Sequence, residues 1–131
     1  LRDLGYALPD YSEIPVTVEM SETMATQYMR LQTRLQLELG ERLASGDRSL
    51  LGAYLQALLC WVDSPWRDEV VIDPSTKNKE KEGIKPVELI RISGLQGDQL
   101  FPKEKAIIDL ILQHKKKGRR SLLFCQHCHT T

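Results

Sequence analysis

The chain has 131 residues, of which 41% are hydrophobic and 27% are charged. This composition is typical of one modest globular domain or parts of two, and it excludes a chain that is disordered throughout. Eighteen basic residues balance eighteen acidic ones, so contact with nucleic acid would have to come from local patches rather than from net charge. The longest apolar stretches fall far short of the roughly 20 residues of a membrane span, and we expect no membrane contact.

The first residues and the cysteines indicate the compartment. The chain starts without Met and without the pattern of a signal peptide, so we expect a segment of a longer, cytoplasmic protein. Three cysteines, Cys60, Cys125 and Cys128, are an odd number and make a poor disulfide framework, which suits a reducing cytoplasm.

Residues 1–72 predict a strand followed by a helical hairpin. β-Branched residues alternate with polar ones over residues 14–20, which predicts a short strand with one buried face. Ser21 can cap the helix that follows. The expected core stripe of this first helix is Met24, Tyr28, Leu31, Leu35 and Leu39.

A turn at residues 45–47 leads to a second helix, which Asp47 or Ser49 can cap. Its expected broad apolar face is Leu50, Leu51, Tyr54, Leu55, Leu58, Leu59 and Val62. Pro65 stops this helix, since proline disfavours helical geometry in the residue before it. Residues 73–86 are rich in charge and offer little to bury, so we expect a flexible linker there.

Residues 87–131 predict the opening of a second domain. A short strand is expected within residues 86–92, and a helix over residues 103–117 with Ala106, Ile107, Leu110 and Ile111 as its core stripe. Pro102 suits the first turn, and Gly118 ends the helix after three lysines. Residues 121–125 form a continuous apolar run, typical of a strand buried in a parallel sheet. The expected class is therefore mixed α/β and helix-rich, with the second domain truncated.

Two stretches resemble superfamily 2 helicases of the Swi/Snf and DEAD/DEAH type. The first has Leu8-Pro9, a strand that ends in Glu19-Met20-Ser21, and then Tyr28; the second has Pro102-Lys103-Glu104-Lys105, Gly118-Arg119-Arg120 and residues 122–127. The resemblance implies that residues 1–72 end motor lobe 1, that 73–86 link the lobes, and that 87–131 begin a RecA-like lobe 2. Cys128-His129 departs from the simpler polar run of the family, which leaves the subgroup open.

By this resemblance the chain is a non-catalytic piece of an ATP-dependent helicase or translocase, which couples lobe movement to movement along DNA or RNA. The sequence has no phosphate-binding loop, no Asp-Glu-x-His and no late arginine motif. We therefore expect no catalytic residue, no metal site and no cofactor in this chain, and ATP and Mg²⁺ only in the parent protein.

The resemblance also implies a nucleic-acid site after the last apolar run, at Gln126, His127 and Thr130, with Thr131 as a weaker candidate. These residues could instead be a frayed end. Lys117, Arg119 and Arg120, together with Lys115 and Lys116, could contact phosphates, or they could simply complement the helix dipole.

Two further features have alternative interpretations. Cys125, His127, Cys128 and His129 are of the types that bind zinc, but one such cluster without a second pair argues against a zinc site. Trp61 and Trp66 could stack on bases or pack between subdomains.

The second hypothesis is a small helical domain for protein–protein interaction, with the helicase resemblance accidental. An apolar stripe that stays exposed after folding would favour it. The exposed edge of a truncated sheet could also drive a homo-oligomer.

Overall fold

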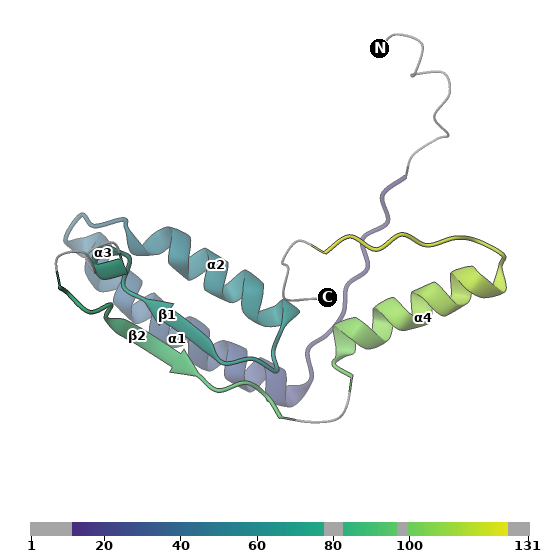
Figure 1. The fold of residues 1–131 in the computed structure, drawn as a ribbon, viewed down its shortest axis with the longest axis horizontal. Helices are drawn as coiled ribbons and strands as arrows, with labels where there is room; N and C mark the ends of the chain where they lie inside the picture. The colour runs from purple at the N-terminus through teal and green to yellow at the C-terminus, as the bar shows by residue number, and fades with distance from the viewer. Residues whose placement is uncertain (1–11, 78–82, 97–99, 126–131) are drawn as a thin grey trace, which may run out of the picture.

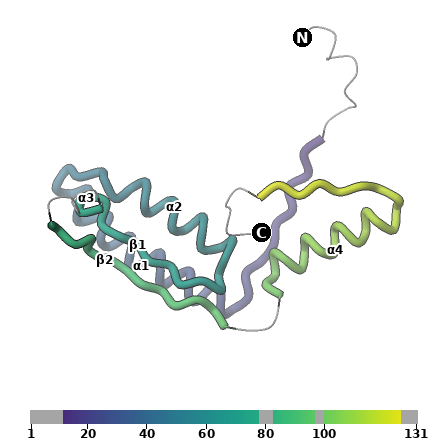
Figure 2. Tube along the Cα trace, in the orientation of Figure 1, coloured from purple at the N-terminus to yellow at the C-terminus, as the bar shows by residue number. Residues whose placement is uncertain are grey.

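The computed structural model describes residues 12–77, 83–96 and 100–125. Its elements are α1 (Glu22–Ala44), α2 (Leu50–Asp63), β1 (Glu69–Ile72), α3 (Pro74–Lys77), β2 (Glu88–Ile92) and α4 (Pro102–Lys116). The helices α1 and α2 form a hairpin beside the two strands, and α4 projects away from them (Figure 1 and Figure 2). The mixed, helix-rich class is confirmed at this level.

Helix α1 begins and packs as the sequence predicts. The Ser21 hydroxyl accepts a hydrogen bond from the Met24 amide at 3.4 Å, which satisfies one of the free donors of the first turn. Met24, Leu31, Leu35 and Leu39 are buried, and Tyr28 packs against them. The apolar stripe is therefore the side of α1 that faces the core.

The strand predicted at residues 14–20 is wrong. This stretch carries no regular secondary structure, and Ile14 and Val16 are 80% and 65% exposed. Alternating apolar residues produce a strand only where another strand accepts their backbone hydrogen bonds, and the described part of the chain supplies none here.

The turn between α1 and α2 closes through glycine. Gly46 has φ +83°, and the amides of Gly46 and Asp47 donate to the carbonyls of Leu43 and Arg42 at 3.0 and 2.8 Å. These are the two bonds of a Schellman motif, which needs a left-handed residue after the helix. The Asp47 carboxylate then accepts from the Ser49 amide at 2.8 Å, so Asp47, rather than the Ser49 side chain, prepares the start of α2.

Only part of the predicted apolar face of α2 is covered. Leu50 and Leu58 are buried as expected, together with Ala57 and Trp61. Leu51, Leu55 and Leu59 are instead exposed. They are spaced four residues apart and form an exposed row along α2. The prediction had placed this row and the buried residues on one broad core face.

The strands β1 and β2 form an antiparallel pair across the predicted linker. Val71 lies opposite Ile90, and the side chains of both are buried, as is that of Ile92. Past the paired strands, the Asp73 amide donates to the Val87 carbonyl at 2.8 Å. The sequence did not predict β1, and its predicted linker at residues 73–86 therefore connects two strands of one sheet.

Helix α4 has nearly the predicted bounds, but its predicted core stripe is wrong. The Glu104 carboxylate accepts from the Phe101 amide at 3.2 Å at the start. Gly118, at φ +66°, ends the helix with the same pair of Schellman bonds, from the Gly118 and Arg119 amides. No residue of α4 is buried, and Leu110 and Ile111 lie in contact with solvent.

The 131-residue chain does not form the buried strand predicted at residues 121–125. These residues follow the Gly118 turn without regular structure, and Leu122 and Phe124 are 80% and 84% exposed. The parallel neighbours that such a strand would need are not among the described elements.

Candidate nucleic-acid interface

The predicted cations lie at the exposed end of α4. Lys117 is the residue that caps the helix, and Arg119 and Arg120 follow the Gly118 turn; all three are exposed. Within the part of the chain that the structure describes, none of them is ion-paired with an acidic side chain. These side chains also lie where the negative end of the helix dipole favours cations, so their position fits either interpretation.

The predicted phosphate-binding residues Gln126, His127 and Thr130 lie outside the described residues, as does Thr131. Of the zinc-type cluster only Cys125 is described, and it is exposed. Elsewhere in the described ranges no three His, Cys, Asp or Glu side chains are grouped as metal ligands.

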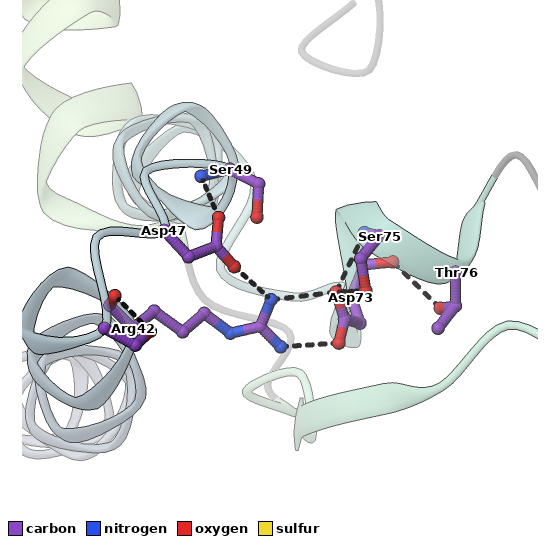
Figure 3. A network of polar contacts seen from close by, with 7 residues as sticks. Arg42, Asp47, Ser49, Asp73, Ser75 and Thr76 are labelled. Atoms are coloured by element: carbon purple, nitrogen blue, oxygen red, sulfur yellow. Dashed lines mark hydrogen bonds and ion pairs between the residues drawn. The ribbon is translucent and has the colours of Figure 1, made fainter.

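An ion pair joins Arg42 of α1 to Asp73, the residue after β1 (Figure 3). The Arg42 guanidinium donates to both oxygens of Asp73, from Nη1 to Oδ1 at 3.0 Å and from Nη2 to Oδ2 at 2.5 Å. Asp73 also accepts from the amide and hydroxyl of Ser75, at 2.9 and 2.7 Å. Asp47 lies 3.5 Å from the same guanidinium.

This network shifts the pKa values of its members. The hydrogen bond from Arg42, followed by those from Ser75, holds the pKa of Asp73 far below its usual range against the opposing effect of burial. The same hydrogen bond raises the pKa of Arg42. A carboxylate that accepts four hydrogen bonds and whose pKa is so low is a poor general base, so we interpret the network as a clamp between α1 and the sheet.

The two tryptophans differ in whether they could stack on a base: Trp61 is buried, and Trp66 keeps part of its surface exposed. Trp61 is 1% exposed and packs beside Tyr28, with ring centroids 6.2 Å apart. Trp66 stacks on Phe101 at 5.9 Å, which occupies one face of its indole. The packing interpretation therefore holds for Trp61, and Trp66 joins the α2 end of the hairpin to the start of α4.

The described residues offer no activated nucleophile. Burial raises the pKa of the Cys60 thiol, which disfavours the reactive thiolate. Burial also raises the pKa of Glu69 on β1.

A second cationic surface was missed by sequence reasoning. Arg30 and Arg34 lie one turn apart on the polar side of α1 and border a surface trough together with Arg91 of β2. The signal was present as an i, i+4 pair of arginines off the core stripe. The antiparallel sheet, which places Arg91 beside this helix, could not be foreseen because β1 was not predicted.

Searching the described residues for a helix long and apolar enough to cross a membrane finds none. The chain matches no protein-family model, no curated protein and no solved structure.

Proposed function

We propose that this chain is the non-catalytic segment between two RecA-like lobes of a superfamily 2 nucleic-acid helicase or translocase. The observation that carries the proposal is that apolar side chains of α4 and of residues 121–125 are exposed to solvent. A capped, glycine-terminated helix with cations at its end precedes an apolar run that remains exposed. This order is the one that the sequence resemblance implies for the beginning of lobe 2.

The exposed apolar residues are of the kind that a larger lobe would cover. Ile108, Leu110, Ile111 and Leu112 of α4 are all exposed, as are Leu122, Leu123 and Phe124. So many exposed apolar side chains in one short stretch are typical of a surface that another part of a protein covers. In the proposal, neighbouring strands and helices of the parent cover it, and residues 121–125 then become a strand of its parallel sheet.

The role in the parent is mechanical. The hairpin and sheet form a packed body, and α4 reaches this body through the Trp66–Phe101 stack and an ion pair between Lys103 and Asp63. Such a small contact permits one unit to turn against the other while the chain stays continuous. ATP-dependent closure of the lobes would use this junction as its joint.

ATP and Mg²⁺ do not fit this chain and would bind elsewhere in the parent. The sequence has no glycine-rich phosphate loop, and the described residues contain no group of three or more His, Cys, Asp or Glu side chains that could hold the metal. A cytoplasmic location is part of the same proposal and rests on the odd number of cysteines.

The reading frame around this segment provides the first test. We expect a phosphate-binding loop upstream and an arginine motif downstream. A frame that codes for neither would contradict the proposal.

The Leu123→Asp variant provides the second test, because the same substitution can be compared in two proteins. In the 131-residue chain it should leave the unfolding free energy unchanged, since Leu123 is 57% exposed. In the parent it should cost more than about 2 kcal/mol, because a charge would be buried in the sheet. Urea unfolding measures both, and an equally small effect in the parent argues against a buried strand.

The second candidate is a protein–protein interaction domain, favoured by the exposed row of Leu51, Leu55 and Leu59 on α2. Anchors at one-turn spacing are typical of helix faces that bind in grooves or pair with another helix. Light scattering of the chain and of Leu55→Asp, with Arg48→Asp as the control, tests for self-association. A monomer at every concentration argues against a homo-oligomer.

A further inference from the structure

A surface trough runs between the polar side of α1 and the end of β2. Its main part has a volume of about 950 Å³ and is bordered by Arg30, Arg34 and Arg91. A smaller hollow of about 380 Å³ shares Glu22, Thr26, Gln27 and Arg30 with it and continues to Leu95. The trough is therefore long and open, a shape that suits an extended polymer better than an enclosed small molecule.

Two of the cations in this trough are unpaired. Within the described residues, the side chains of Arg30 and Arg34 form no hydrogen bond or ion pair, and both are exposed. Like charges one turn apart on a helix repel each other, so this spacing does not help α1 to form. Their guanidinium groups are free to bind oxygen atoms of a ligand in a bidentate manner.

The acidic residues nearby leave this part of the trough positive. Glu88 and Asp68 hold Arg91, at 2.7 and 3.9 Å, so Arg91 is already compensated. Glu22 borders both hollows two helical turns before Arg30, and Glu38 lies one turn after Arg34 on α1. Within the described residues neither carboxylate forms an ion pair with Arg30 or Arg34, so these two arginines are the unpaired cations of the trough.

The remaining lining provides hydrogen-bond donors but no stacking surface. The hydroxyl groups of Thr33 and Ser93 and the amide of Gln27 border the trough, and no aromatic side chain does. The Thr26 hydroxyl also borders it but already donates to the Glu22 carbonyl at 2.9 Å. Hydroxyl, amide and guanidinium groups are those that contact phosphates, whereas base recognition in single strands uses aromatic rings. One helix and one strand border the trough, which suits one backbone rather than a duplex.

We propose that the trough between α1 and β2 binds successive phosphates of a single-stranded nucleic acid without regard to base sequence, through Arg30 and Arg34. These two arginines are about 6 Å apart along the helix axis, so they can meet different phosphates of one strand. The choice of nucleic acid over another polyanion rests on the proposed function. The position of the site rests on the geometry of the trough alone.

The test is the fluorescence anisotropy of a labelled oligothymidylate of 20 nucleotides, titrated with the 131-residue chain without ATP. The Arg30→Ala/Arg34→Ala variant should bind at least about tenfold more weakly, and the slope of log K against log salt should fall by about 1.4. The control Arg48→Ala/Lys85→Ala removes two exposed cations outside the trough and should change affinity less than threefold. Circular dichroism should show that both double variants are folded. If Arg30→Ala/Arg34→Ala is not folded, Arg30→Gln/Arg34→Gln takes its place.

Three outcomes would overturn the proposal: no binding, equal weakening in both double variants, or equal competition by a poly-glutamate peptide of matched charge. Loss confined to Lys117→Ala/Arg119→Ala would also overturn it and assign the contact to the end of α4. Binding that depends on the trough, in a chain whose reading frame lacks motor motifs, would contradict only the proposed function. A motor parent with an inert trough would contradict only this inference.

Discussion

The helices α1 and α4 show how similar sequence patterns lead to different degrees of burial. Both carry apolar residues at three- and four-residue steps, and both end in a Schellman motif with a left-handed glycine. Helix α1 buries four residues against α2 and the sheet, whereas α4 buries none. An apolar stripe therefore predicts that a helix needs a partner, but it does not say whether this chain supplies one.

The largest expected effect contrasts two Leu→Ala substitutions, one in each helix. Leu35 is 0% exposed, so Leu35→Ala should lower the unfolding free energy by about 2–5 kcal/mol. Leu112 on α4 is exposed, and Leu112→Ala should cost less than about 0.5 kcal/mol. Urea denaturation followed by circular dichroism measures both. Similar losses would mean that α4 packs in solution.

The ion pair between Arg42 and Asp73 should make the packed body sensitive to acid. At pH 7, Asp73→Asn should cost about 1.5–3 kcal/mol, since a charged hydrogen-bonded pair is broken. The pKa of Asp73 is lower in the folded than in the unfolded chain, so its contribution is complete above about pH 4–5 and is lost as the pH falls further.

The difference in stability between wild type and Asp73→Asn should therefore shrink between pH 5 and pH 2. Glu88→Gln, which breaks the exposed pair with Arg91, is the control and should have a smaller effect. A difference independent of pH would exclude the clamp.

Gly94 allows the chain to pass close to the end of α2. A Cβ atom at this position would clash with the Trp66 carbonyl, while the Leu95 amide donates to the Pro65 carbonyl at 2.7 Å. We expect Gly94→Ala to cost about 1–3 kcal/mol in thermal or urea unfolding. Gly52→Ala, in the open on α2, should instead stabilise the chain by up to about 1 kcal/mol. If Gly94→Ala leaves the unfolding free energy unchanged, the chain at Gly94 is not held close to the Trp66 carbonyl in solution.

The smallest effect compares the two helix-ending glycines. Gly46→Ala and Gly118→Ala each place a side chain at positive φ, which costs about 1–2 kcal/mol. For Gly46 the cost should appear in global unfolding, because the turn is part of the packed body. For Gly118 it should appear as faster amide exchange at the end of α4, with global stability unchanged. If both substitutions lower the global unfolding free energy equally, α4 unfolds in the same cooperative unit as the packed body.

Local signals in the sequence predicted the helices well. The Ser21 cap, the stripe of α1, the turn at Gly46 and the stop at Gly118 were all confirmed, because each depends on neighbours within a few residues. The bounds of α4 follow from Pro102 and Gly118 in the same way. None of these signals depends on the tertiary partner of the helix.

Features that depend on distant residues were not predictable. Asp73 was assigned to a solvated linker because its neighbours are charged, yet it is buried against Arg42, 31 positions earlier. The strand β1 has only four residues and no alternating pattern that could distinguish it from a loop. The trough escaped prediction for the same reason, since Arg91 reaches α1 only through the pairing of β1 with β2.

The pairing of β1 with β2 also determines how the chain could be divided. The two strands lie on either side of the charged stretch, and both contact the helical hairpin. A protease cut in that stretch would leave two pieces that still share a sheet and a core. Neither piece retains a complete hydrophobic interior by itself, so fragments ending at Lys77 and starting at Gly83 should fold only when mixed.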